Sequence, residues 1–217
     1  MIYIIMCGGD YPKFDKPRWM LPFKGECIVE RTIRLLREHG VDDISISSND
    51  DRLERFGVPV IRHNNSYVSW GYNDSQGYWC DAFYLTESPV CYLFGDVIYS
   101  QAAIKTIVET GTDDVAFFGS APPFSREYPK LWIEPFGFKV VNTQHFKQAI
   151  ADVKRLQDAG RFGREPIAWE VWNVISRGAD GDVNTIDHDS YIHINDWTTD
   201  IDKPEEIYLL EKLAGEE

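Results

Sequence analysis

The residues best suited to chemistry lie in one stretch near the N-terminus, CGGDYPKFDKPR, at positions 7–18. Glycines let a backbone approach phosphate oxygens closely, and backbone N–H groups can then bind those oxygens. Four cations lie within twelve residues of this acidic chain: Lys13, Lys16, Arg18 and Lys24. The stretch therefore predicts a phosphate-binding loop. A plain turn between a strand and a helix is the alternative, because neither GxGxxG nor GxxxxGK[ST] occurs here.

Composition narrows the class of protein. The chain has 217 residues, 43% hydrophobic and 26% charged, which fits one compact domain. We expect a cytoplasmic protein, because no secretory leader and no apolar run of about 20 residues is present. A net charge of −13 argues against a general nucleic-acid binder. Four widely spaced cysteines without a CxxC pair indicate buried thiols and no zinc site.

Alternating elements predict the fold that positions the loop. The apolar run 2–6 is typical of a buried parallel strand, and Val29, Ile33 and Leu36 have the spacing of a helix that ends near Gly40. Further strands are predicted at 42–48, 58–61 and 89–94. This order indicates an α/β fold, a single domain with a mostly parallel central sheet flanked by helices. Ligands of such sheets bind outside the carboxyl ends of the strands.

The second half of the chain contains fewer clear strands. A strand is predicted at 113–119, and one or two more at 130–142, with an antiparallel position at the sheet edge as one option. Helices are predicted at 143–160, at 166–176 and after Pro204. We expect 1–217 to form one domain, with 1–110 as the nucleotide-binding half and 111–217 as the acceptor-binding half, and we expect the C-terminal part from Thr143 onward to be α-rich.

The first 45 residues resemble the N-terminal signature of the nucleotidyltransferase superfamily with a GT-A-like fold. This superfamily includes MobA-like NTP transferases, sugar-phosphate nucleotidyltransferases and choline-phosphate-type cytidylyltransferases. Five residues fit its pattern: Pro17, Leu21, Gly25, Glu30 and Arg31. Three features depart from it. Asp10 stands where a second glycine is expected, Arg18 replaces the usual lysine, and only Lys13 could supply the charge of the signature arginine.

The resemblance implies roles for the loop and for one aspartate. It implies that nucleotide binding uses Cys7, Gly8 and Gly9, and that phosphate charge is neutralised by Lys13, Arg18 and Lys24. In YLFGDVIYS it implies that Asp96 holds a catalytic Mg²⁺. A glycine and an aspartate after an apolar strand also occur in ordinary turns.

Three carboxylates compete as the second metal ligand. PIAWEVWNVI resembles a helix of choline-phosphate-type cytidylyltransferases, which nominates Glu170, and NDWTTDIDKPEEIYLLEKL resembles a C-terminal stretch of the superfamily, which nominates Asp200 or Asp202. Asp202 and Glu205 also have the spacing of a capping box, which alone would explain Asp202. The alternative interpretation of Glu170 is a carboxylate on the solvent-facing side of a helix.

The segment 62–85 is rich in Asn, Tyr, Trp and Gly, which suits recognition of a base and ribose. Asn73, Asp74 and Ser75 are the candidates there, and an irregular surface loop is the alternative.

The predicted reaction transfers a nucleoside monophosphate, with CMP from CTP preferred, to a small phosphorylated acceptor, using Mg²⁺ and releasing pyrophosphate.

Other functions remain open at this point. The acceptor could be a sugar 1-phosphate paired with another NTP, and the expected cellular process is cell-surface polysaccharide biosynthesis. Glycosyl transfer is a rival, although Phe94-Gly95-Asp96 stands where a DxD motif is usual. A non-catalytic nucleotide-binding relative is the third alternative, with Asp10 in its favour.

Overall fold

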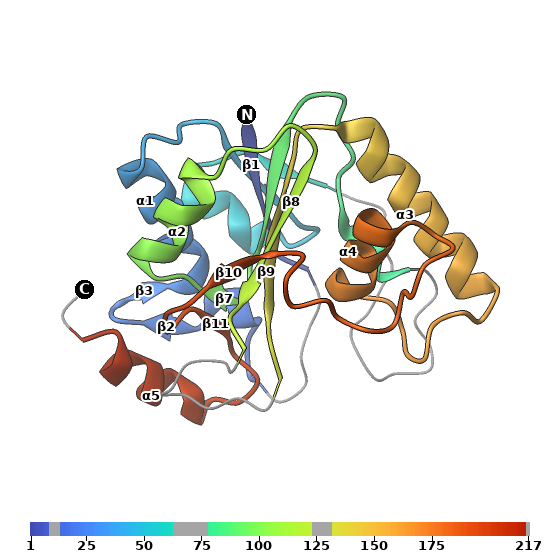
Figure 1. The fold of residues 1–217 in the computed structure, drawn as a ribbon. Helices are drawn as coiled ribbons and strands as arrows, with labels where there is room; N and C mark the ends of the chain where they lie inside the picture. The colour runs from blue at the N-terminus through green and yellow to red at the C-terminus, as the bar shows by residue number, and fades with distance from the viewer. Residues whose placement is uncertain (9–13, 63–77, 123–131, 216–217) are drawn as a thin grey trace.

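The computed structural model describes residues 1–8, 14–62, 78–122 and 132–215. A seven-stranded sheet forms its centre, in the order β10-β8-β9-β6-β1-β4-β5 (Figure 1). Neighbouring strands pair in parallel, except that β9 runs antiparallel to both β6 and β8. The strands of this sheet are β1 (Ile2–Met6), β4 (Ile44–Ser47), β5 (Val60–Ile61), β6 (Val90–Phe94), β8 (Val115–Ser120), β9 (Pro135–Val140) and β10 (Ile192–Ile194). The predicted α/β fold with a mostly parallel sheet is confirmed.

Helices cover both faces of the sheet. α1 and α2 lie on one side and α3 and α4 on the other, while α5 lies apart beside β2 and β11 (Figure 1). Their bounds are α1 (Ile28–Glu38), α2 (Gln101–Glu109), α3 (Thr143–Asp158), α4 (Ala168–Arg177) and α5 (Glu205–Leu213). Three short 3₁₀ helices also occur: η1 (Arg18–Met20), η2 (Asp51–Phe56) and η3 (Trp79–Ala82). Among the described helices, none combines the length and apolar character that a membrane span requires.

The helix predicted from apolar spacing is α1. Val29, Ile33 and Leu36 are buried on the face that packs on the core. Gly40 has a φ of 78° just after the helix ends, a conformation that glycine adopts without steric cost. One apolar stripe and one glycine therefore define both the face and the end of this helix.

β9 differs from the prediction in its position, since it lies inside the sheet and not at its edge. Its side chains Phe136, Phe138 and Val140 are all buried. Gly137 permits the close pairing with β6, because a Cβ there would lie 2.2 Å from the carbonyl oxygen of Tyr92. A strand covered on both faces gains more burial inside a sheet than at its edge.

Two small antiparallel pairs lie outside the main sheet, and one of them attaches the C-terminal segment to the first half of the chain. β7 (Val97–Ile98) pairs with β11 (Thr199–Asp200), and β2 (Pro22–Phe23) pairs with β3 (Glu26–Cys27). A second, smaller core joins these pairs to α5: Leu21, Phe23, Ile28, Ile98, Ile201, Leu210 and Ala214. The expectation of an α-rich C-terminal part after Thr143 was incomplete, since the short strands β10 and β11 also come from it.

Candidate functional site

The carboxyl ends of β1 and β6 meet closely. The backbone N–H of Gly95 donates to the carbonyl oxygen of Met6 at 3.0 Å. A Cβ on Gly95 would lie 2.6 Å from Cys7 Sγ, so only glycine fits without a shift. Asp96 is therefore placed beside the start of the glycine-containing loop, as the positions of the two strand ends predicted.

Arg18 connects Asp96 to the C-terminal half of the chain. Its Nη2 forms an ion pair with Asp96 Oδ2, and its Nη1 lies 3.6 Å from Asp200 Oδ2. Nη1 also donates to the carbonyl oxygen of Ile201 at 3.2 Å. The three charged side chains are 24%, 28% and 16% exposed for Arg18, Asp96 and Asp200. Thus the structure brings together one candidate cation and two candidate metal ligands from distant parts of the sequence.

Asp200 reaches this position because its segment docks on the start of α2. In the β7–β11 pair Asp200 lies opposite Val97, the residue that follows Asp96. The backbone N–H of Ser100 donates to Thr198 Oγ1 at 3.0 Å, and the Ser100 hydroxyl donates to Asp196. These contacts hold the second carboxylate next to the first.

Asp200 also belongs to a group of acidic residues that sequence reasoning did not assemble. Ligand oxygens of Glu134, Asp200 and Asp202 all lie within 4.8 Å of one another. Mg²⁺ binds oxygen ligands, carboxylates above all, so these three residues fit a hard divalent cation, and Arg18 links Asp96 to them through Asp200. The structure therefore adds Glu134 to the two C-terminal candidates.

Glu134 is held rigidly at the entry to β9. It is 7% exposed, its N–H donates to Ser120 Oγ at 2.7 Å, and the Ser120 N–H donates to its carbonyl oxygen at 2.8 Å. The indole N–H of Trp132 donates to its carboxylate. Sequence analysis missed Glu134, although an acidic residue inside the otherwise apolar run WIEPF was a usable signal.

The start of α5 uses a different glutamate from the one expected. Glu206 Oε2 accepts hydrogen bonds from the N–H groups of Asp202 at 2.7 Å and Lys203 at 3.1 Å. Asp202 thus contributes its backbone to the helix start, while its carboxylate joins the acidic group. The capping interaction predicted for Glu205 is made by Glu206.

Glu170 lies at the start of α4 and is buried there. Its carboxylate accepts hydrogen bonds from the N–H of Ile167 at 2.9 Å and from Arg164 Nε at 2.7 Å. This is a helix-capping arrangement reinforced by an ion pair. Within the described part of the chain, Glu170 is not one of the clustered acidic ligand atoms. Its environment is also not the solvent-facing one given as its alternative.

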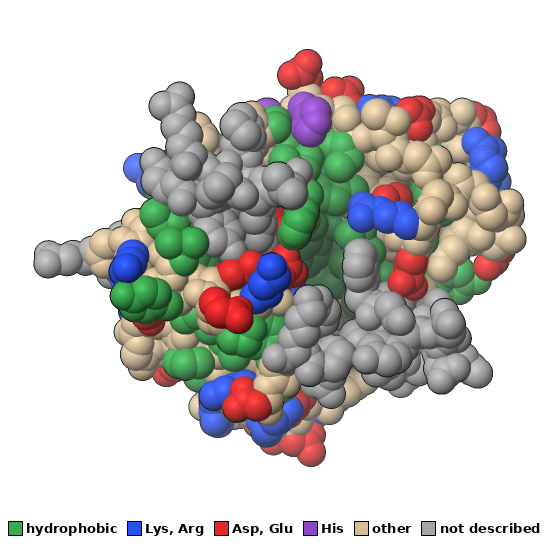
Figure 2. Space-filling model, turned by 90° about the horizontal axis from the view of Figure 1, so that it is seen from below, with side chains coloured by type: hydrophobic (Ala, Val, Ile, Leu, Met, Phe, Trp, Pro, Cys, Tyr) green, Lys and Arg blue, Asp and Glu red, His purple; other side chains and the backbone are tan. Residues whose placement is uncertain are grey.

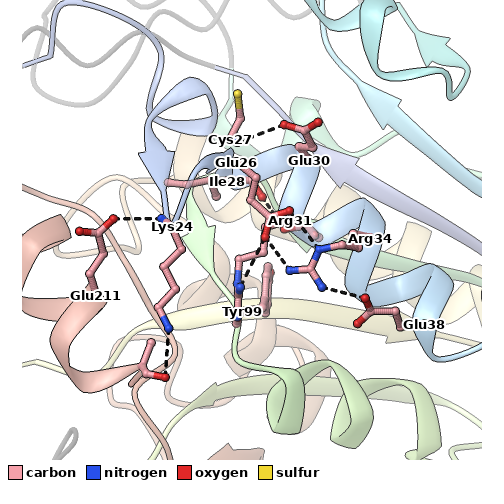
Figure 3. A network of polar contacts seen from close by, with 12 residues as sticks. Lys24, Glu26, Cys27, Ile28, Glu30, Arg31, Arg34, Glu38, Tyr99 and Glu211 are labelled. Carbon is pink, nitrogen blue, oxygen red and sulfur yellow. Dashed lines mark hydrogen bonds and ion pairs between the residues drawn. The ribbon is translucent and has the colours of Figure 1, made fainter. Parts of the chain in front are cut away.

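Lys24 contacts the C-terminal end of α5. It sits in the β2–β3 turn with a φ of 49°, and its N–H donates to Glu211 at 2.9 Å. Its ammonium donates to the carbonyl oxygens of Ala214, at 3.2 Å, and Gly215 (Figure 3). The ammonium thus interacts with the negative end of a helix, in the manner of a C-terminal cap.

The start of the loop is only partly described. Burial, with Asp96 and Asp50 as further causes, raises the pKa of the Cys7 thiol well above its usual range, so the sulfur stays protonated. Gly8 is exposed, and nothing lies within 4 Å of where a Cβ would be. Five other candidates lie outside the described residues: Gly9, Lys13, Asn73, Asp74 and Ser75.

Charged side chains and a hollow in the surface occur together at this edge of the sheet. Figure 2 views the molecule from below and shows acidic and basic side chains gathered beside a hollow with hydrophobic side chains in it. A divalent metal held by such carboxylates, together with an arginine, could neutralise and orient phosphate groups. The geometry therefore suits a metal-bound phosphorylated ligand.

Known structures share the fold at low sequence identity. A Bacillus anthracis protein described as a glucose-1-phosphate thymidylyltransferase matches with a TM-score of 0.58 and 14% identity, covering 100% of this chain and 96% of that one. The inositol-1-phosphate CTP transferase from T. maritima matches with a TM-score of 0.58 and 14% identity, covering 99% and 96%. CTP:phosphocholine cytidylyltransferase from Streptococcus pneumoniae matches with a TM-score of 0.53 and 13% identity, covering 97% of each.

Sequence comparison identifies the family. None of the curated protein sequences matches the chain significantly. The family model for the MobA-like NTP transferase domain matches residues 3–117, a range that contains most of β1 as well as Arg18 and Asp96. Because this match spans more than half of the chain, the protein belongs to the family of MobA-like NTP transferase domains.

Proposed function

We propose that this protein is a Mg²⁺-dependent nucleotidyltransferase that transfers a nucleoside monophosphate from an NTP to a small phosphorylated acceptor. The observation that carries the proposal is the contact of Arg18 with Asp96 and Asp200 at the carboxyl ends of β6 and β11. These three side chains come from both halves of the chain. We assign nucleotide binding to residues 1–110 and acceptor binding to 111–217, with Asp200 reaching back to the nucleotide side.

Asp96 and Asp200 would hold the metal, with Glu134 or Asp202 as neighbouring carboxylates. When bound, Mg²⁺ supplies Lewis-acid stabilisation of charge on the phosphate oxygens. We assign Arg18 to neutralising the negative charge of the same phosphate oxygens. Lys13, which lies outside the described residues, is assigned the same role. Gly8 leaves the backbone open to close approach by phosphates. Lys24, engaged with α5, is assigned to anchoring that helix.

The acceptor phosphate attacks the α-phosphorus of the NTP, its oxygen forms the new P–O bond, and pyrophosphate leaves. A phosphomonoester with a second pKa near 6 is mostly dianionic at neutral pH, so the chain need not supply a general base. Its residues would bring two anions together and screen their repulsion. This requirement would account for the grouping of Arg18 with several carboxylates at this edge of the sheet.

CTP is the preferred nucleotide in this proposal. Its support is the resemblance of the α4 sequence to choline-phosphate-type enzymes, together with two structural neighbours that are CTP-dependent by name. The thymidylyltransferase among the neighbours favours a second candidate, transfer from another NTP to a sugar 1-phosphate. Both reactions release pyrophosphate, so one assay covers them.

The test is a pyrophosphate-release screen of the four NTPs against phosphorylated amino alcohols, inositol 1-phosphate and sugar 1-phosphates, with and without Mg²⁺. We expect metal-dependent release with one pair. Asp96→Asn should lower it by roughly a hundredfold or more, because metal stabilisation of phosphate charge is worth several kcal/mol. Asp113→Asn is the matched control, an exposed aspartate outside the site.

The rival functions give different results in the same experiment. Sugar transfer from a nucleotide sugar without pyrophosphate release would indicate a glycosyltransferase. Tight NTP binding with no release from any acceptor would indicate a non-catalytic relative. Equal release by Asp96→Asn and Asp113→Asn would exclude Asp96 from the metal site.

A further inference from the structure

Arg18 places a positive charge between the two carboxylates assigned to the metal. Its fork contacts Asp96 through Nη2 and faces Asp200 through Nη1, 3.6 Å from Oδ2. We propose that Arg18 is a built-in counter-cation, which competes with a divalent metal for Asp96 and Asp200 until nucleotide phosphates draw the guanidinium away. This inference rests on the proposed function, and it makes tight metal binding depend on the nucleotide.

The electrostatic basis is the cost of leaving adjacent carboxylates without a cation. Asp96 and Asp200 are 28% and 16% exposed, and Glu134 and Asp202 add negative charge beside Asp200. Water screens such half-buried groups incompletely, so a cation near them is favourable. Arg18 supplies that cation from within the chain and links Asp96, just after β6, to Asp200 in β11.

Arginine suits this task better than the lysine usual at its position in the resembled pattern. A planar guanidinium presents several donors in a fixed fork and can contact two partners at once, whereas an ammonium is a point charge. Arg18 uses this capacity, since it also donates to the carbonyl oxygen of Ile201. The same fork binds phosphate oxygens in a bidentate manner, which gives the side chain an alternative partner of higher charge.

The chain around Arg18 allows the side chain to move without the backbone. Arg18 begins η1, and the next residue, Trp19, is 3% exposed with the Arg52 guanidinium 5.8 Å from its ring centroid. Leu21 is buried in the small core with Ile201. Because the neighbours of Arg18 are anchored by burial, its backbone can stay in place. A rotation about its side-chain bonds would then move the guanidinium from the carboxylates to the phosphates.

The experiment measures Mn²⁺ binding to the whole chain by electron paramagnetic resonance, without nucleotide. Arg18→Gln removes the charge and keeps a polar side chain of similar reach. We expect it to bind Mn²⁺ about three- to tenfold more tightly than wild type, as loss of one or two partly exposed ion pairs would allow. With saturating CTP the difference should shrink, because Arg18 is then engaged by phosphate.

The matched control is Arg34→Gln, which removes an arginine from its ion pairs with Glu26 and Glu38, two carboxylates not assigned to the metal. Its Mn²⁺ affinity should equal that of wild type. Equal or weaker Mn²⁺ binding by Arg18→Gln would overturn the competition. If that variant does not fold, Arg18→Lys replaces it, and the same two outcomes apply because one ammonium cannot hold both carboxylates.

Failure of this inference can be told from failure of the proposed function. Metal-dependent pyrophosphate release by wild type, with unchanged Mn²⁺ affinity in Arg18→Gln, would remove only the competition. If wild type shows no release and Asp96→Asn binds Mn²⁺ as wild type does, the metal assignment itself is lost, and the competition with it.

Discussion

Gly95 lies so close to Met6 that a Cβ built on it would be 2.7 Å from the Met6 carbonyl oxygen. This contact and the hydrogen bond from the Gly95 N–H set the distance between the ends of β1 and β6. Asp96 and the residues proposed to bind phosphate, from Cys7 onward, follow directly after these two ends. Their relative position therefore depends on a residue that has no side chain.

The Gly95–Met6 contact leads to a prediction about stability. Gly95→Ala should lower the free energy of unfolding by about 1–3 kcal/mol, because the methyl group would meet backbone as well as Cys7 Sγ. Thermal unfolding followed by circular dichroism measures the change. Gly111→Ala is the control, since nothing lies within 4 Å of its Cβ position. Equal melting temperatures for the two variants would refute the packing argument.

The competing metal ligands can be separated by stability and Mn²⁺ affinity. Glu170→Gln should lower stability by about 1–2 kcal/mol, because the carboxylate caps α4 and pairs with Arg164, and should leave Mn²⁺ affinity unchanged. Asp200→Asn should weaken Mn²⁺ binding in the presence of CTP by tenfold or more. Weaker Mn²⁺ binding by Glu170→Gln in folded protein would return that residue to the metal site.

Lys24 is expected to act on stability. Lys24→Ala removes the ammonium from the carbonyl oxygens at the end of α5 and should cost about 1 kcal/mol. Turnover per folded molecule should stay near that of wild type. Thermal unfolding and pyrophosphate release, measured on the same preparation, test both statements. Lys105→Ala provides an exposed-lysine control. A loss of turnover in Lys24→Ala at unchanged stability would support the catalytic role suggested by the resemblance.

The cysteines should differ in reactivity. Burial raises the pKa of Cys80 and of Cys91 to about 12, and that of Cys7 well above its usual range, so these thiols are protonated at neutral pH. Cys27 is half-buried, which departs from the expectation of four buried thiols. A thiol reagent should titrate one cysteine quickly in native protein and four in denaturant. Cys27→Ser should abolish the fast reaction, and a fast phase that persists would contradict this assignment.

Much of the fold followed from the sequence, because local patterns carry local structure. Continuous apolar runs identified β1 and β6, since strands buried on both faces exclude polar residues. Helical spacing identified α1, α3 and α4. β7 and β11 have two residues each, too few for any periodicity, so they were not predicted.

Position within the sheet could not be read in the same way. The residues of β9 predicted a strand, but they did not predict its place between β6 and β8. That place depends on pairing with β6, which lies more than 40 residues earlier in the chain, and on the close approach that Gly137 permits. Such long-range pairing is decided by which arrangement buries most apolar surface, and a local window contains no record of that comparison.

By itself, the sequence determined the α/β class, the end of β1 just before Cys7, and the position of Asp96 after the end of a strand. Residue type and spacing suffice for these three features. Only the tertiary structure decided which distant groups share a site. It placed Asp200 and Glu134 together through the pairing of β11 and the entry of β9, and it paired Lys24 with the end of α5 and Glu170 with Arg164. It also put Arg18 between two carboxylates. The physical reason is that attraction between charges depends on distance in space, which chain order does not specify.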